Sequence, residues 1–355
     1  MDEPRRAFLD DLLSTASPSG YEVPGQRVWV DYVSAFADEV RTDEYGNAVA
    51  VHEGSDDADA SVAFAGHADE IGFIVREVSD DGFLKLGRVG GSDRTVTQGQ
   101  HVTVHTDDGP LAGVVGQTAI HLRDRDDDSA PEITEQHVDV GVAEGEDAAD
   151  LVEVGDPITF AQRVRELEDG RLTARGMDNR VGIWAAAEGL RRAVESGADA
   201  TVYAVSTVQE EVGLQGAEMV GFDLDPDAVI ACDVTHATDS PGVPGKKSTG
   251  VELGAGPVVA RGSANHPALV AAVRGVADER DIDVQLQATG TRTGTDADAF
   301  YTARGGTPAL NLGLPNRYMH TPVEVVDAED LDAMADLLGA VGARADGIAP
   351  FGVDL

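Results

Sequence analysis

The stretch SVAFAGHADEIGFIV, residues 61–75, is almost wholly apolar until it reaches His67. A continuous apolar run without polar alternation is typical of a strand that is covered on both faces. Such strands occur in sheets that carry helices on both sides. The stretch therefore predicts an α/β fold, and it places a histidine where one of the buried strands ends.

The segments around this stretch alternate between helical and extended patterns, as an α/β sheet requires. Apolar residues at helical spacing predict helices over residues 5–17, 23–37, 177–195, 266–282 and 328–345. Short apolar runs predict further strands over residues 46–54, 198–211, 228–237 and 308–314. The expected architecture is a sheet sandwiched between helices.

Residues from about Gly72 to Phe160 interrupt this alternation with short strands between turns. The pattern predicts strands within residues 82–90, 100–117, 137–143 and 155–160. An interruption of this kind is most simply an inserted β-rich domain. We therefore expect one discontinuous α/β domain, residues 1–71 and 165–355, and an insert at residues 72–164.

The chain is strongly acidic, since 26 basic residues against 65 acidic residues give a net charge of −39. No basic stripe is available to neutralise phosphates, which argues against a nucleic-acid partner. High net charge keeps proteins soluble and is a lever that halophiles use. The composition therefore predicts a protein from a salt-rich cytoplasm, with an acidic mesophilic enzyme as the alternative.

Membrane and secretory locations are not expected. No apolar run approaches the ~20 residues of a membrane span. The first residues, MDEPRRAFLDDLL, lack the pattern of a signal peptide. Cys232 is the single cysteine, so no intrachain disulfide can form, which fits a reducing cytoplasm. Its place in the apolar stretch AVIACDVT favours a buried small side chain over a nucleophile.

Possible metal ligands recur where predicted strands end and where a predicted helix begins. In open α/β sheets, ligands collect at the carboxyl ends of the strands. Imidazole and carboxylate groups together suit zinc, cobalt or manganese. The residues concerned are His67, Asp69, Asp178, Glu210, Glu211, Asp233 and His320.

This mixture of side chains matches the needs of a site with two metal ions. Two neighbouring ions need a bridging ligand, and a carboxylate with two oxygens serves this purpose. Asp69 follows His67 at a spacing that lets it orient the imidazole ring. One member of the pair Glu210–Glu211 could bind metal while the other accepts a proton from water.

Each of these residues also has a plainer interpretation. A lone His67 is more often a buried histidine with a hydrogen-bond partner, and adjacent glutamates in an acidic chain are more often surface residues. Asp178 could simply cap a helix. The coincidence at several strand ends favours the metal site. His236 is a rival ligand that we expect to be exposed or beside the ligands.

Several motifs, taken in order, resemble those of the dinuclear-metal aminopeptidases of the glutamyl and deblocking aminopeptidase family, which includes the tetrahedral TET peptidases. These motifs are GHADEIGF, MDNR, QEEVGLQGA, DVTHATDSPG, GTDADA and RYMHTPVEVV. The resemblance runs nearly from end to end of the chain. It implies a mixed-sheet α/β/α metallopeptidase domain with an inserted, β-barrel-like dimerisation domain.

The same resemblance implies roles for individual residues. One metal ion would be held by His67, Asp178 and Asp233, and the other by Asp178, Glu211 and His320. Asp178 would bridge the two ions, Glu210 would be the general base, and Asp69 would be the partner of His67. No role is assigned to Asp296 or Asp298 in GTDADA.

The implied activity is the release of N-terminal residues from peptides that have a free N-terminus. Two divalent ions per subunit are expected, with zinc first and cobalt or manganese as alternatives. The resemblance further implies a halophilic archaeal member whose dimers assemble into a tetrahedral dodecamer. Two alternatives are a related dinuclear hydrolase of acylated amino acids and a non-catalytic assembly subunit with a degenerate site.

Overall fold

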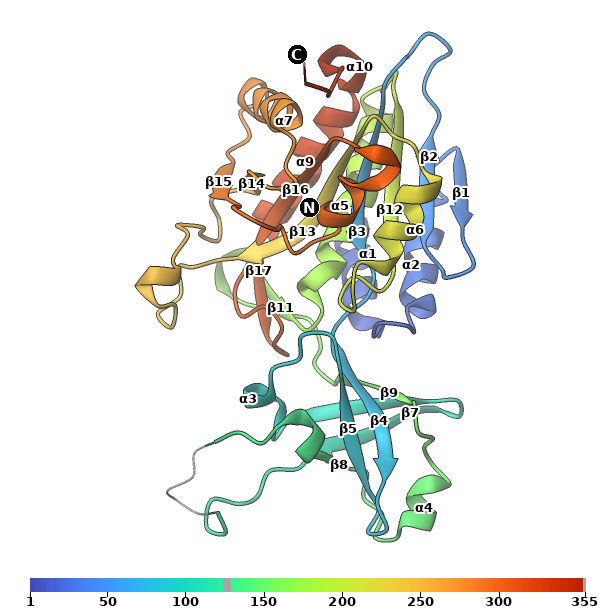
Figure 1. Cartoon of the computed structure of the whole chain (residues 1–355), viewed down its shortest axis with the longest axis vertical. Helices are drawn as coiled ribbons and strands as arrows, with labels where there is room; N and C mark the ends of the chain where they lie inside the picture. Colours follow the sequence, from blue (N-terminus) through green and yellow to red (C-terminus); the bar gives the residue numbers. More distant parts are fainter. Residues whose placement is uncertain (124–128, 354–355) are drawn as a thin grey trace.

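The computed structural model describes residues 1–123 and 129–353. Figure 1 shows two lobes, a sheet flanked by helices above and a smaller β lobe below. The upper lobe holds a sheet of eight strands in the order β1-β2-β12-β3-β13-β16-β14-β15. Their bounds are β1 Glu39–Thr42, β2 Ala48–His52, β12 Thr201–Thr207, β3 Ser61–His67, β13 Ala228–His236, β16 Ala309–Asn316, β14 Val258–Arg261 and β15 Gln285–Ala288.

The sheet is mixed. Strands β12, β3, β13 and β16 run parallel to one another at its centre. Strand β2 pairs antiparallel with β12 at one side, and β14 pairs antiparallel with β16 at the other. The predicted α/β fold class with a mixed sheet is confirmed. Because the central strands are parallel, their carboxyl ends lie along one edge of the sheet.

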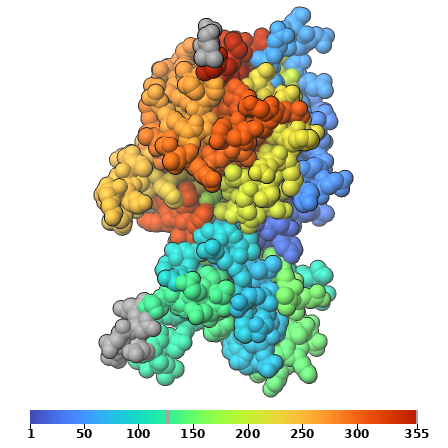
Figure 2. Space-filling model, viewed as in Figure 1, coloured from blue at the N-terminus to red at the C-terminus, as the bar shows by residue number. Residues whose placement is uncertain are grey.

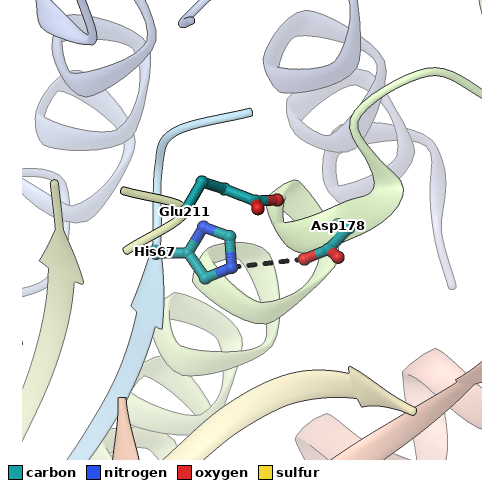
Figure 3. Close-up of side chains that lie close together, drawn as sticks. All are labelled: His67, Asp178 and Glu211. Carbon is teal, nitrogen blue, oxygen red and sulfur yellow. Dashed lines mark ion pairs between the residues drawn. The ribbon is translucent and has the colours of Figure 1, made fainter. Parts of the chain in front are cut away.

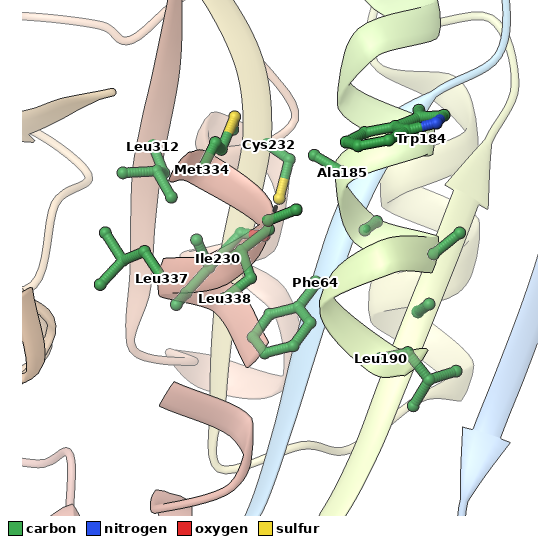
Figure 4. Packing of buried hydrophobic residues seen from close by; sticks show 14 of the residues in the cluster. Phe64, Trp184, Ala185, Leu190, Ile230, Cys232, Leu312, Met334, Leu337 and Leu338 are labelled. Carbon is green, nitrogen blue, oxygen red and sulfur yellow. Dashed lines mark hydrogen bonds between the residues drawn. The ribbon is translucent and has the colours of Figure 1, made fainter. Parts of the chain in front are cut away.

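Successive residues of β3 pack into two different cores, as a strand covered on both faces requires. Val62 and Phe64 belong to the core beneath α5 and α9, while Ala63 and Ala65 belong to the core beneath α6. Figure 4 shows Phe64 between side chains of these two long helices. The helices of the first face are α1 Glu3–Ser14, α2 Val23–Val33, α5 Met177–Glu195, α7 Pro267–Glu279 and α9 Ala328–Gly342. Those of the second face are α6 Gln215–Asp223 and α8 Ala297–Phe300.

Cys232 is buried in the core of the first face, on β13. Burial raises the pKa of its thiol far above the ordinary value, which disfavours the thiolate. The prediction that Cys232 is a buried side chain is confirmed.

The lower lobe is a closed barrel in the strand order β4-β5-β8-β7-β6-β9. Figure 2 shows it as the lower lobe of the molecule. Its core includes Phe73 and Phe160, whose rings meet edge to face. The strands are β4 Gly72–Val78, β5 Phe83–Val89, β8 His137–Asp139, β7 Gly109–Val115, β6 His101–Thr106 and β9 Pro157–Phe160. The exact division of the chain into domains stays a prediction.

The remaining described elements are short. Strands β10 Arg165–Glu166, β11 Arg171–Ala174 and β17 Glu324–Asp327 form a small separate sheet. The short α-helices are α3 Arg94–Thr97, α4 Gly145–Ala149 and α10 Ala345–Ile348, and short 3₁₀ helices lie at Ile133–Glu135, Glu168–Gly170, Gly245–Lys247 and Ala303–Gly305. Within the described ranges, no helix combines the length and apolar character that crossing a membrane would demand.

The predicted end of a strand at His67 is confirmed, and the chain then passes into the barrel. The apolar stretch over residues 61–75 forms two strands, β3 and β4, in two different sheets. Between them Glu70 is buried and accepts a hydrogen bond from the backbone amide of Ser17 at 3.0 Å. Its carboxylate also pairs with Arg175 and Arg180. Because these partners come from distant segments, the sequence could not indicate that Glu70 is buried at this junction.

Candidate metal centre

The predicted site residues converge at the carboxyl edge of the central strands. His67 is the last residue of β3, and Asp233 lies near the end of β13. Asp178 lies in the first turn of α5, although its backbone angles there are not helical. His320 follows β16 in the loop that leads to β17. Segments far apart in sequence thus meet at one place, as the strand topology requires.

Glu210 and Glu211 were expected at the end of a strand, but β12 ends earlier, at Thr207. The two glutamates lie in the following turn, where Gln209 adopts a positive φ of 57°. A turn can direct adjacent side chains toward the same cavity, whereas a strand sends them to opposite faces. This correction explains how both carboxylates reach the site.

Asp178 links the two histidines. Its Oδ1 atom lies 3.2 Å from Nε2 of His67, and its Oδ2 atom lies 3.2 Å from Nε2 of His320. Figure 3 shows the Asp178 carboxylate facing the ring of His67, with Glu211 beside them. The N-cap position of α5 is Gly176, so the helix-cap interpretation of Asp178 was wrong.

The other carboxylates divide between the two histidines. Oε1 of Glu211 lies 3.4 Å from Nε2 of His320. On the other side, Oδ1 of Asp233 and Oε2 of Glu210 each lie 3.8 Å from Nε2 of His67. The site contains two groups of possible ligand atoms, and within each group the atoms all lie within 4.8 Å of one another. One group comes from His67, Asp178 and Glu211, and the other from His67, Glu210 and Asp233.

The cluster gathers several buried carboxylates around two histidines, an arrangement that favours the binding of cations. Burial and the neighbouring carboxylates raise the pKa of Glu210 to about 10. Burial would lower the pKa of His67, but nearby carboxylates, first of all that of Glu210, raise it well above its usual range. Hydrogen bonds to Asp178 and Glu211 raise the pKa of His320 to about 11. The carboxylates thus draw protons onto both imidazoles, and divalent cations would replace those protons. The residues present therefore fit a metal centre.

Asp69 contacts three of the candidate site residues, His67, Glu210 and Glu211. It is fully buried, and its Oδ1 atom lies 3.2 Å from Nδ1 of His67. The same carboxylate accepts hydrogen bonds from the backbone amides of Glu210 at 2.9 Å and Glu211 at 3.1 Å. The hydroxyl of Ser19 donates to it at 2.6 Å. Asp69 therefore orients the His67 ring and also fixes the turn that carries both glutamates.

Sequence reasoning missed two other residues that hold this turn. The amide of Val208 donates to the side-chain oxygen of Asn47 at 3.0 Å. The amide of Gln209 donates to the carboxylate of Glu22 at 3.2 Å. Glu22 belongs to the motif SPSGYE, but nothing in that motif indicates which amide its side chain would meet. Burial raises the pKa of Glu22 to about 7.

Asp296 and Asp298 take different places near the site. Asp296 is buried and accepts a hydrogen bond from the Thr207 hydroxyl at 2.6 Å, and burial raises its pKa to about 6. Asp298 accepts hydrogen bonds from the amides of Thr293 and Gly294, both at 3.0 Å, and so shapes a loop of the site wall.

A cavity of about 380 Å³ opens onto the cluster. Beyond the candidate ligands it is lined by Val234, Thr235, His236, Thr293, Gly294, Thr295 and Met319. His236 is exposed, as expected, and forms part of this wall. The candidate carboxylates therefore line a cavity that is open to a small ligand.

A family model and a characterised relative match most of this chain. The family model described as M42 glutamyl aminopeptidase matches residues 46–337. A lysyl aminopeptidase of Pyrococcus furiosus is 35% identical over 339 residues, which cover 94% of this chain and 95% of that protein. These matches extend over the sheet, the barrel and every candidate ligand.

Solved structures show the same architecture. A TET aminopeptidase from a marine-sediment archaeon of the Thaumarchaeota has a TM-score of 0.91 and 29% identity, covering 98% of this chain and 99% of that one. The TET1 peptidase of Pyrococcus horikoshii, which can assemble into a tetrahedron or a large octahedral shell, has a TM-score of 0.85 and 29% identity, covering 95% of this chain and 99% of that one. Together with the family model, these similarities show that the chain belongs to the M42 family of metal-dependent aminopeptidases.

Proposed function

We propose that this aminopeptidase works with two divalent metal ions and with Glu210 as its general base. One observation carries the proposal: the two carboxylate oxygens of Asp178 face two different histidines, each at 3.2 Å. A carboxylate with one oxygen toward each of two imidazoles is placed to bridge two ions.

The candidate ligands divide into two sets that share Asp178. His67, Asp178 and Asp233 would hold one ion, and Asp178, Glu211 and His320 the other. Zinc suits this set of imidazole and carboxylate donors, and cobalt and manganese are alternatives. When bound, such ions polarise a carbonyl group and lower the pKa of a water molecule.

Glu210 has the position of a base. Its side chain borders the cavity, and Asp69 fixes its backbone amide at 2.9 Å. Cations in the site would lower the pKa of Glu210, because an opposite charge favours the ionised form of a carboxyl group, and Glu210 would then carry its negative charge. It would then accept a proton from the attacking water and pass it to the leaving amine.

The carboxylate-rich wall also favours a substrate with a free, positively charged α-amine. Peptides with a free N-terminus should therefore be cleaved, and the same peptides acetylated at the α-amine should not. A panel of aminoacyl chromogenic substrates that includes lysyl, glutamyl and leucyl compounds would give the preferred residue. Equal rates on free and acetylated peptides would instead favour a hydrolase of acylated amino acids.

We further propose that the barrel is a dimerisation module within a larger homo-oligomer of tetrahedral type. The barrel segment exposes large apolar side chains, which are candidates for an interface. They are Val114, Ile120, Leu122, Leu151 and Val154. The relation to the TET peptidases supports the same assembly.

The net charge of −39 supports a halophilic origin and a location in a salt-rich cytoplasm. Repulsion within and between such subunits weakens when ~1 M salt shortens the Debye length to about 3 Å. The melting temperature should therefore rise between low and molar KCl, and light scattering should show large particles only at high salt. An unchanged melting temperature would contradict the halophilic origin, and a monomer at every salt concentration would contradict the assembly.

A further inference from the structure

Glu324 connects two of the candidate ligands through their backbones. It lies at the start of β17, and its side chain is buried, with 2% of the residue exposed. Its Oε2 atom accepts a hydrogen bond from the amide of Asp178 at 3.2 Å. Its Oε1 atom accepts a hydrogen bond from the amide of His320 at 2.9 Å. One carboxylate thus joins the segment of the bridging ligand to the segment of His320.

Regular secondary structure supplies neither amide with an acceptor. The amide of Asp178 lies in the first turn of α5, where no intrahelical acceptor is available, and Gly176 at the N-cap has no side chain to accept it. His320 has a positive φ of 63°, a conformation that costs free energy for any residue with a side chain. Neither segment would hold its backbone in this position without a partner. Glu324 supplies that partner to both.

We propose that Glu324 is a positioning residue of the metal centre, which holds Asp178 and His320 at the separation that the ion on the His320 side requires. The inference rests on the proposed two-ion site. Glu324 faces backbone amides and not the cavity, so it acts on the ion through the two ligands. No Arg or Lys of the described residues forms an ion pair with it, so cations in the site would also offset its charge.

Asp330 offers a matched control in the same part of the fold. It is a buried carboxylate, 2% exposed, that also accepts two backbone amides, those of Gly254 and Gly256, both at 2.7 Å. It forms no hydrogen bond with any candidate ligand. Removing Asp330 should therefore reproduce the general cost of losing such a carboxylate without the specific effect on metal binding.

The experiment is a titration of the metal-free protein with Co²⁺, followed by the visible absorption of the bound ion. In Glu324→Ala the affinity for one ion should fall by about 10–100-fold, the usual loss when a partner that orients a ligand is removed. The ion that remains should show the same spectrum as the ion that remains in His320→Ala. Glu324→Gln, which keeps one acceptor oxygen, should be intermediate, and Asp330→Ala should bind Co²⁺ as the wild type does.

The outcomes separate this inference from the proposed function. A wild-type protein that binds fewer than two ions would refute the two-ion site itself. If the wild type binds two ions and Glu324→Ala binds them equally tightly, only the role of Glu324 is refuted. If Asp330→Ala lost as much Co²⁺ affinity as Glu324→Ala, the effect of Glu324 would be a general effect on stability and the inference would be refuted. Should Glu324→Ala not fold, an unchanged affinity in Glu324→Gln would overturn the inference and a weakened ion on the His320 side would support it.

Discussion

Replacing Glu210 with glutamine should reduce kcat by about 10²–10⁴-fold, the usual contribution of a general base. Glutamine keeps the shape of the side chain but cannot accept a proton from water. Both metal ions should remain bound, because the proposed ligand set does not include Glu210. Turnover of an aminoacyl substrate, together with the metal content of the same sample, tests this result.

The neighbouring Glu211 provides a matched comparison. The two glutamates have similarly buried side chains, 10% and 6% exposed, and both have amides held by Asp69. Because Glu211 faces His320, Glu211→Gln should weaken metal binding as well as activity. If Glu211→Gln kept two tightly bound ions while Glu210→Gln lost one, the two roles would have to be exchanged.

Asp178→Asn should have a still larger effect, with turnover falling beyond the range of a lost general base, since both ions depend on this side chain. An amide has a single oxygen, so it cannot face both His67 and His320 with an acceptor as Asp178 does. Metal content should fall to one ion or fewer per chain.

The control for this variant is Asp296→Asn. Asp296 is also a buried carboxylate near the site, but its hydrogen bond runs to Thr207 and it approaches no histidine of the cluster within ion-pair distance. The Asp296→Asn variant should retain two ions, because cation binding depends on the bridging position of Asp178 and not only on the negative charge near the site. Loss of metal in both variants would mean that total negative charge, rather than the bridge, holds the ions.

The central architecture and the ligand set could be predicted because they follow local patterns. A run such as VAFAG is typical of a strand covered on both faces, and His67 directly follows it. The parallel order of β12, β3 and β13 then brings the strand ends together. The prediction failed at Glu210 and Glu211, which lie in a turn after β12 and not in the strand, because the hydrogen bonds that fix this turn come from distant segments.

The supporting residues could not be predicted for the same reason. Glu22, Asn47 and Glu324 act by accepting hydrogen bonds from backbone amides of other segments. Every residue except proline carries such an amide, so the sequence does not indicate which one a given side chain will meet. Strands β14 and β15, of four residues each, also escaped prediction.

The central claim is that catalysis requires two ions bridged by Asp178. It is tested most directly by titrating the metal-free wild-type protein with Zn²⁺ while bound ions are counted and peptide turnover is measured in the same samples. The account predicts that two ions bind per chain and that full turnover appears only when the second is bound. Full turnover with one ion per chain, or in a protein shown to be free of metal, would contradict it.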